Sequence, residues 1–381
     1  MPNNWKTYNL GDVIEIKYGK DHKKLQEGKI PCYGTGGIMR FVERAISEEE
    51  SVLIPRKGSL NNIYYINEPF WTVDTLFWTK VNADFVNAKY LYYNLKIVDF
   101  ASKDVGSAIP SLTTSLLKRL EITLPPLPEQ KAIASILTAI DDKIELNLQI
   151  NKTLEEMAMT LYKHWFVDFG PFKDGKFIDS ELGMIPEGWE VVDLKSICDV
   201  INGRAYKNDE FLSEGTPIIR IQNLKGGGKT VYSDLILPES KYVESGDLIY
   251  AWSATFGPYI WHGPKSIYHY HIWHLAVFPE KVSKYYLFHH LLRTSNQMKE
   301  HGTGSIFTHL TKGTMETQRV LLPAKNVMKE YHQNAALYGE KILLNKDENQ
   351  TLTTLRDTLL PKLISGEVRV EDVQQTLDQA L

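Results

Sequence analysis

The sequence predicts an α+β protein with two globular modules joined by two long antiparallel coiled-coil helices in a pseudo-two-fold internal repeat. Three observations predict this fold class. The chain repeats itself, short strand-like runs in each repeat indicate a small mixed sheet with helices, and each repeat ends in a long apolar stripe spaced three and four residues apart. A length of 381 residues allows two or three domains.

The repeat is seen in residues of the first half, here called anchors, that occur again in the second half a fixed number of positions later. Early anchors recur after 184 residues and late ones after 198, so the two interiors differ in length. We therefore expect a first module over 1–128, a long helix over 129–170, a second module over 171–327, and a second long helix with a tail over 328–381. The early anchors are Trp5, Leu10 and Gly19, which recur as Trp189, Leu194 and Gly203; later, Leu112-Thr113 and Leu124-Pro125 recur as Leu310-Thr311 and Leu322-Pro323.

Short runs inside the modules predict strands and one packed helix. The segments 51–66 and 246–260 are typical of short strands. An aromatic run at 90–93 recurs at 286–289, and we expect it to pack on the sheet rather than to stack on bases.

Each module is followed by a long helix. The first starts at the proline-rich segment 125–129, which carries helix-start signals, and has no Gly or Pro from Glu129 to Trp165. The second runs from about Met328 to Leu360, where Pro361 ends it or allows a last distorted turn. The repeated stripe predicts a packing seam formed by Ile144, Asn147, Asn151, Leu154, Met157 and Leu161 in the first helix and by Ile342, Asn345, Asn349, Leu352, Leu355 and Leu359 in the second.

Two surface helices, each lying on its own domain, are the alternative to this seam. About 37 helical residues at about 1.5 Å each form a rod of about 55 Å. Half-sites one DNA turn apart lie about 34–36 Å from centre to centre, so such a rod could hold two readers at a fixed separation. Because the interior sequences of the two modules differ, the DNA sequences of the two half-sites should also differ.

Composition restricts the function classes. The net charge is −4, but the acidity lies in the two helical segments, while the modules are close to neutral, so charge alone neither supports nor excludes DNA binding. The two cysteines, Cys32 and Cys198, are expected to be buried and reduced. We find no candidate membrane span and no secretion signal, and we expect a cytoplasmic protein.

Three short motifs suggest other chemistry and are rejected. The segment 226–230 lacks the leading glycine of a phosphate loop, since that position is Asn223. The kinase-like segment 168–170 stands without the other kinase motifs. His269, His271 and His274 lie in a strand-like run that places only two of them on one face, so we predict no metal site.

Several segments resemble the specificity subunit of type I restriction–modification systems. Their order and duplication span almost the whole chain, although the segment 324–327 replaces the proline-rich entry in the second copy. The segments that carry the resemblance are 106–113, 124–130, 164–169, 185–190 and 360–367.

The resemblance implies a non-catalytic DNA reader. It implies two target-recognition domains that read the halves of an asymmetric bipartite site in double-stranded DNA. The helices would act as spacer and as docking surface for two modification (methyltransferase) subunits and for restriction subunits. S-adenosylmethionine, ATP and magnesium would then belong to those partners, and no cofactor to this chain.

Residue types that contact phosphates and base edges gather on candidate loops. In the first module we expect Lys20, Lys23 and Lys24 to contact phosphate. The candidates for the groove are Arg56, Lys57, Asn61, Asn62 and Tyr64. In the second module the candidates are Arg204, Lys207, Arg220, Gln222, Asn223 and Lys225, with Trp252, Ser253 and Thr255 at the place that corresponds to 56–59.

Two rival functions remain. A non-enzymatic scaffold with two protein-binding heads on a coiled-coil rod would share the repeat, but its binding would lack the steep salt dependence of a DNA contact. A self-contained methyltransferase would need a cofactor pocket and a motif that holds a flipped base, and the sequence shows no such motif.

Overall fold

The protein has two compact units with closely related topologies, and unit 2 has one more strand in its second sheet. The computed structural model describes residues 4–103, 110–300 and 310–372. Unit 1 comprises 1–145 and 349–381, and unit 2 comprises 146–348. The boundary between them falls inside each of the two long helices. The predicted division into four segments stays a prediction.

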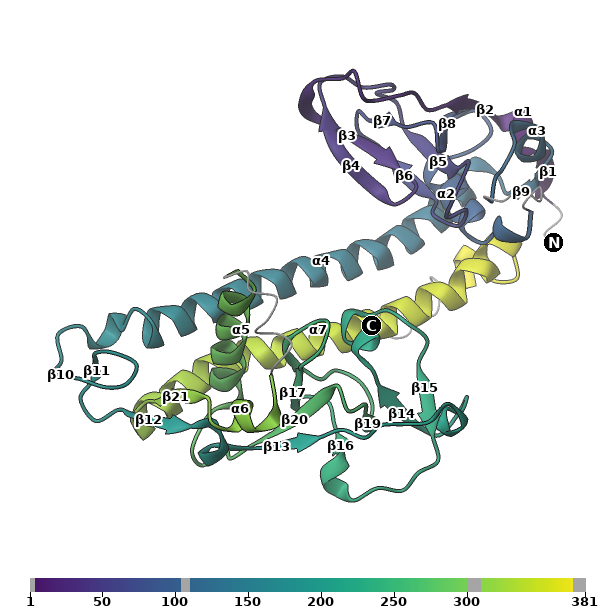
Figure 1. The fold of residues 1–381 in the computed structure, drawn as a ribbon. Coiled ribbons are helices and arrows are strands. Elements are labelled where there is room, and N and C mark those ends of the chain that lie inside the picture. The colour runs from purple at the N-terminus through teal and green to yellow at the C-terminus, as the bar shows by residue number, and fades with distance from the viewer. Residues whose placement is uncertain (1–3, 104–109, 301–309, 373–381) are drawn as a thin grey trace. The chain divides into compact units, whose positions relative to one another are not determined.

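Unit 1 contains a four-stranded sheet in the order β2-β8-β5-β6, a three-stranded sheet β4-β3-β7 and a separate pair β1-β9 (Figure 1). Its helices α1, α2 and α3 are short. The bounds are β1 (Lys6–Asn9), α1 (Leu10–Val13), β2 (Ile14–Tyr18), β3 (Glu27–Gly34), β4 (Gly37–Val42), β5 (Ser51–Pro55), β6 (Tyr64–Ile66), β7 (Trp71–Thr72), β8 (Leu76–Val81), α2 (Ala88–Lys96), α3 (Thr114–Lys118) and β9 (Glu121–Leu124).

Unit 2 repeats this plan with sheets in the orders β13-β20-β17-β18 and β15-β14-β19-β16 and the pair β12-β21. A two-stranded pair, β10-β11, lies within unit 2 before β12. The bounds are β10 (Phe177–Ile178), β11 (Ile185–Pro186), β12 (Glu190–Asp193), β13 (Cys198–Asn202), β14 (Thr216–Ile219), β15 (Val231–Ser233), β16 (Tyr242–Val243), β17 (Leu248–Ala251), β18 (Gly257–Ile260), β19 (Ser266–Tyr268), β20 (Ile272–Val277), α5 (Lys284–Glu300), α6 (Lys312–Glu316) and β21 (Arg319–Leu322).

The register confirms the sequence repeat. Lys6 pairs with Leu124 in unit 1 and Glu190 with Leu322 in unit 2, at the shifts of 184 and 198 found in the sequence. Strands form over 51–55 and 64–66 and over 248–251 and 257–260, as predicted.

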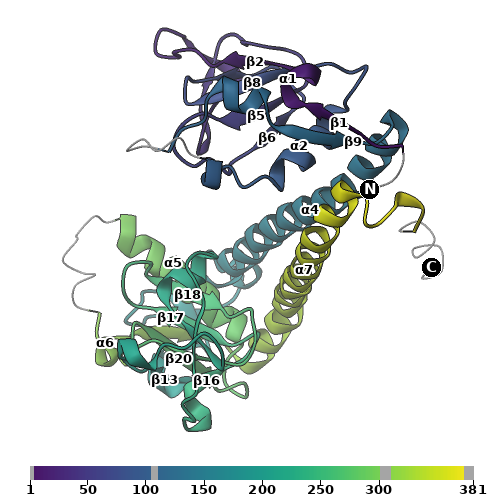
Figure 2. The same cartoon turned by 90° about the vertical axis from the view of Figure 1, so that its right-hand side faces the viewer.

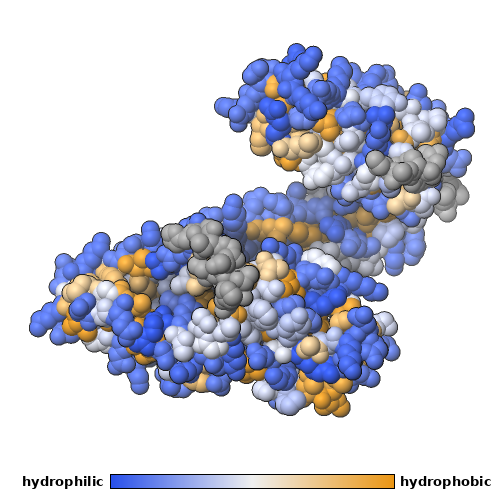
Figure 3. Space-filling model, in the orientation of Figure 1, coloured by the Kyte–Doolittle hydropathy of each residue, from blue (hydrophilic) through white to orange (hydrophobic). Residues whose placement is uncertain are grey.

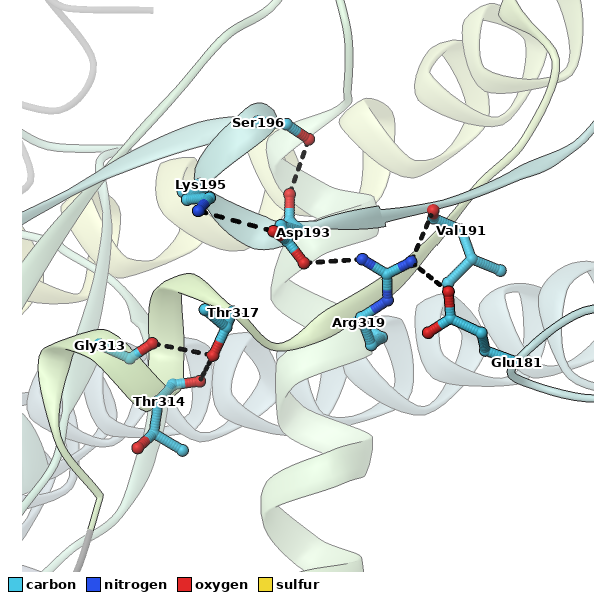
Figure 4. Close-up of polar contacts among 9 residues, drawn as sticks. All are labelled: Glu181, Val191, Asp193, Lys195, Ser196, Gly313, Thr314, Thr317 and Arg319. Carbon is cyan, nitrogen blue, oxygen red and sulfur yellow. Dashed lines mark hydrogen bonds and ion pairs between the residues drawn. The ribbon is translucent and has the colours of Figure 1, made fainter.

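The strand pair β12-β21 in unit 2 is held by an arginine. Nη1 of Arg319 donates to Oδ1 of Asp193 at 2.7 Å, and Nη2 donates to Oε1 of Glu181 at 2.6 Å and to the carbonyl of Val191 at 3.2 Å (Figure 4). The arginine thereby joins β21 both to β12 and to the segment before it. Unit 1 has Glu121 opposite Asn9 at the equivalent strand end, so this arrangement is not repeated there.

The long helices are α4 (Leu127–Phe166) and α7 (Lys325–Ser365). They lie side by side and antiparallel in both views (Figures 1 and 2). α7 begins at Lys325, within the segment that replaces the proline-rich entry. It also continues through Pro361 to Ser365; because Pro361 has no backbone N–H, this last part of the helix lacks one backbone hydrogen bond.

Each core combines the start of one long helix with the end of the other. In unit 1, Ile133 of α4 and Leu363 of α7 belong to the same buried cluster as Trp5. In unit 2, Phe166 of α4 and Tyr331 of α7 belong to the cluster of Trp189. The predicted aromatic core is confirmed, since Tyr90 of α2 and Tyr286 of α5 are fully buried. Cys32 and Cys198 are both buried and free.

Candidate nucleic-acid interface

In both units, candidate loops emerge from the same end of one sheet, the one that contains β5 in unit 1 and β17 in unit 2, whereas the 220–225 loop of unit 2 follows β14 in the other sheet. The backbone N–H of Arg56 donates to the carbonyl of Thr75 at 2.8 Å, and that of Trp252 donates to the carbonyl of His271 at 3.1 Å. The predicted correspondence between Trp252 and the 56–59 loop is therefore seen in the backbone. The frame is shared, whereas the side chains on it differ.

Glycine makes this shared frame possible. A Cβ on Gly19 would lie 2.0 Å from the carbonyl oxygen of Val73, and one on Gly203 would lie 2.3 Å from that of His269. Such an approach excludes any side chain. The recurring glycine therefore brings the strand that ends at residue 18 or 202 against the loop that follows β7 or β19.

The first lysine loop of unit 1 is exposed. The side chains of Lys20, Lys23 and Lys24 are exposed to solvent, and the loop backbone is tied down because the N–H of Lys20 donates to the carbonyl of Thr72 at 2.9 Å. Exposed ammonium groups on a fixed backbone suit phosphate contact.

A groove lies beside these lysines in unit 1. Its wall includes the 34–36 turn between β3 and β4, and the carbonyl of Thr35 accepts two hydrogen bonds of 2.8 Å, from Nδ2 of Asn62 and from the hydroxyl of Tyr64. Two predicted residues therefore hold this turn in place. The groove is lined by Asp21, His22, Lys23, Gly34, Thr35, Gly36, Met39, Val73, Asp74 and Thr75.

Arg56 lies next to this groove with its guanidinium partly engaged. Nη1 donates to the carbonyl of Asp74 at 3.0 Å, and the guanidinium carbon lies 5.3 Å from the centre of the Tyr18 ring. These contacts orient the side chain. The neighbouring predicted residues Lys57 and Asn61 are exposed.

In unit 2 the first predicted arginine is paired. Nη2 of Arg204 donates to Oε1 of Glu210 at 2.6 Å, and this contact lowers the pKa of Glu210. The guanidinium also lies 5.0 Å from the centre of the Tyr206 ring. Arg204 therefore fixes its own loop, whereas Lys207 points to solvent.

The next loop of unit 2 is bonded internally. The N–H of Arg220 donates to Oδ1 of Asn223 at 2.9 Å, and Nη2 of Arg220 donates to the carbonyl of Lys229 at 2.6 Å. These bonds hold the glycine-rich segment 226–228 against the turn formed by residues 220–223. Gln222 and Lys225 remain exposed on it.

The third loop of unit 2 carries an indole. Nε1 of Trp252 donates to the carbonyl of Tyr270 at 2.8 Å. Ser253 and Thr255 are partly buried, and the N–H of Thr255 bonds to the carbonyl of Ser253 at 2.6 Å. The residue between them, Ala254, has a φ of 55°, in the left-handed region that marks a tight turn.

Two of the three histidines lie in a loop rather than on a strand. His269 and His271 follow β19, because the backbone of 269–271 turns back to bond Arg204 and Ile219, and only His274 lies within β20. Burial lowers the pKa of all three imidazoles. Among the residues that the structure describes, no group of three His, Cys, Asp or Glu side chains is placed to hold a metal ion.

Sequence reasoning missed two segments that lie among these loops. The turn at Thr35 in unit 1 and the aromatic run 269–271 in unit 2 pack beside the predicted residues. The glycines at 34, 36 and 37 were a turn signal that could have located the first segment. The second was considered only as a metal site.

The helix seam is polar at its centre. Asn147, Asn151 and Asn345 are buried. Ile144, Leu154, Leu161, Ile342, Asn349, Leu352 and Leu359 are partly buried. Met157 and Leu355 are each 45% exposed and so lie on the outer side of their helices.

The family follows from comparison with known proteins. The family model for the type I restriction modification DNA specificity domain matches residues 2–156 and 186–354, which is once in each repeat. The chain belongs to this family. It is thus a specificity subunit and not a catalytic one, as the resemblance implied, and the curated relatives bear the same description.

Two relatives illustrate the match of this specificity subunit. The type I restriction enzyme MjaIX specificity subunit of Methanocaldococcus jannaschii is 28% identical, with 98% of this chain and 95% of that protein covered. The HindI specificity subunit of Haemophilus influenzae is 24% identical, with coverage of 96% and 99%. The similarity therefore extends over both modules and both helices.

A solved structure shares the fold. The type I restriction–modification S subunit from M. genitalium superposes with a TM-score of 0.66 at 18% identity, over 95% of this chain and 97% of that one. The predicted fold class, with two recognition modules and paired long helices, is confirmed.

Proposed function

We propose that this specificity subunit reads an asymmetric bipartite site in double-stranded DNA, with one half-site for each unit. The observation that carries the proposal is the shared backbone frame with different side chains. Thr75 receives its hydrogen bond from Arg56, whereas His271 receives the same bond from Trp252. Two units with the same backbone but different loop side chains are suited to bind the same kind of ligand, duplex DNA, at two different base sequences.

Phosphate contact would come from the exposed lysines. Lys23 lines the groove of unit 1, and Lys24 is the exposed residue after it. In unit 2, Lys225 is exposed directly before the glycine-rich segment 226–228. Each phosphate contact releases counterions, so affinity should fall steeply with salt. This local charge offsets the net charge of −4.

Base reading would come from side chains held within the loops. Arg56 is oriented by Asp74 and Tyr18, and an oriented guanidinium matches the two acceptors of guanine in the major groove. Gln222, next to the bonded pair Arg220 and Asn223, can likewise reach a base edge.

The long helices would space the units and receive the partner subunits. Apolar surface is visible over α4 in Figure 3, and half-exposed apolar side chains are suited to a protein contact. We propose two modification subunits and restriction subunits as partners, with S-adenosylmethionine, ATP and magnesium bound there. The exposed apolar side chains are Leu146, Leu148 and Met157 of α4 and Leu337, Leu344 and Leu355 of α7. Within the described residues, no helix is long and apolar enough to cross a membrane.

Salt-dependent binding tests the proposal. The subunit, assembled with a modification subunit, should bind a duplex that carries its site with an affinity that falls linearly in log–log coordinates as salt rises. Lys23→Ala should weaken binding to all duplexes and reduce the slope by about one. Lys118→Ala, an exposed lysine of α3, is the matched control. If binding to the duplex depended neither on the salt concentration nor on Lys23, the result would instead support a scaffold with protein-binding heads.

A further inference from the structure

Four aromatic side chains form a cluster where unit 2 would meet DNA. Trp252 comes from the β17–β18 loop, and His269, Tyr270 and His271 come from the β19–β20 loop; we call these four the aromatic platform. The ring centres are 3.9 Å apart for Tyr270 and His271, 4.4 Å for His269 and Tyr270, and 5.3 Å for Trp252 and His271. Tyr270 is 40% exposed.

The indole of the platform is held in place, and it has no hydrogen-bond donor to spare. The single N–H of Trp252 already bonds to the carbonyl of Tyr270. The indole also stacks on the buried Trp273, with ring centres 5.9 Å apart and planes at 22°. Trp252 can therefore offer only a fixed apolar face.

The platform is also largely without charge. Burial lowers the pKa of His269 and of His271, which favours neutral imidazoles at pH 7. Of the nearby cations, Arg204, which bonds the backbone of Tyr270, is paired with Glu210. The other, Arg220, whose charge further lowers the pKa of His269, directs Nη2 to the carbonyl of Lys229. A neutral aromatic surface is poorly suited to phosphate, so base edges are its better ligand.

Among base edges in the major groove, only thymine presents an apolar group, the 5-methyl. We propose that the aromatic platform, led by Tyr270, contacts a thymine methyl group in the half-site read by unit 2. This inference rests on the proposed function. Unit 1 carries Arg56, Asp74 and Thr75 at the equivalent positions, so its half-site should not be read in this way.

Replacing thymine by deoxyuridine tests the contact, because it removes the methyl group alone. The complete complex with a modification subunit would be titrated with duplexes in which each thymine of that half-site is replaced in turn. One replacement should weaken binding by the wild-type complex about fourfold, the value of one buried methyl group. Tyr270→Phe should keep this penalty, and Tyr270→Ala should abolish it.

Three results would overturn the inference: a half-site without thymine, wild-type binding indifferent to every replacement, or a penalty that persists in Tyr270→Ala. Deoxyuridine in the other half-site is the internal control, since Tyr270 variants should not alter its effect. Failure of the proposed function looks different, because the wild-type complex would then not distinguish the duplex with its site from any other duplex.

Discussion

Nδ2 of Asn345 in α7 donates a 2.8 Å hydrogen bond to Oδ1 of Asn151 in α4, and both side chains are buried. Asn151 in turn donates to the carbonyl of Ile342, at 3.4 Å. In unit 1, Asn349 donates to the carbonyl of Ile144 at 3.2 Å, which is the same bond displaced by 198 residues. Buried asparagines of this kind fix the register of paired helices.

Breaking this pair should destabilise the protein. Asn345→Leu leaves the buried amide of Asn151 without its donor and should reduce the free energy of unfolding by about 1–3 kcal/mol. The double variant with Asn151→Leu should cost less than the sum of the two single changes. Urea unfolding measures this, with Leu344→Ala, at a 62% exposed neighbour, as control. Additive costs would show that the two amides are not coupled.

The close approach at Gly19 should be essential to unit 1. Gly19→Ala would place a Cβ 2.0 Å from the carbonyl oxygen of Val73, and this overpacking should cost about 1–3 kcal/mol of stability or more. The change should also displace the loop beside Arg56 and weaken reading of the first half-site. Thermal unfolding and binding to half-site variants measure the two effects.

Gly36→Ala is the matched control, since nothing lies within 4 Å of its added Cβ. It should leave the melting temperature close to that of the wild type. An unaltered Gly19→Ala protein would contradict the described packing of β2 against the loop.

Acid should destabilise unit 2 through two buried histidines. Burial lowers the pKa of His289 and of His290 to about 4, below the usual 6.5, so the unfolded chain takes up these protons first. Their stabilising effect is therefore complete above about pH 6.5 and is lost as pH falls towards 4. Each histidine should contribute a loss of about 2 kcal/mol between pH 6.5 and 5.

The pH dependence is checked by urea unfolding at both pH values. In His290→Gln, the stability lost between pH 6.5 and 5 should be about half of that lost by the wild type. His164→Gln, at an exposed position, is the control. An identical pH dependence in wild type and His290→Gln would refute the assignment.

Lengthening both helices should change the gap between the half-sites. Four residues inserted after Asn147 and four after Asn345 add about one turn, or about 6 Å, to each helix. The spacer should then grow by about two base pairs, and neither half-site should change. Mapping of methylated sites in cells that express the variant with its modification subunit measures this. An unchanged gap would reject the role of the helices as a ruler.

The repeat and the long helices could be predicted because packing constrains them position by position. Trp5 and Trp189 are both buried, and Gly19 and Gly203 both allow a close backbone approach. Anchors with such strict requirements stay visible in the sequence even where the interiors diverge.

The unit boundary and the loops could not be predicted in the same way. Periodicity locates a helix but not the point where its packing partner changes, so the boundary at Glu145 and Asn349 is invisible in sequence. The apolar stripe also placed Met157 and Leu355 in the seam, although both lie on the outer side of their helices. The reason is that apolar residues spaced three and four apart gradually rotate around a straight helix. The loop at 269–271 depends on long-range bonds to Arg204 and Ile219, which no local pattern reveals.

The most direct test of the two-reader account is an exchange of one module followed by mapping of methylated DNA. Residues 1–128 would be replaced by the corresponding segment of another specificity subunit, and the chimera would be expressed with the modification subunit. We predict a single bipartite motif in which one half-site is new and the other half-site and the gap are those of the wild type. A motif that changes in both halves, or in neither, would contradict the assignment of one half-site to each unit.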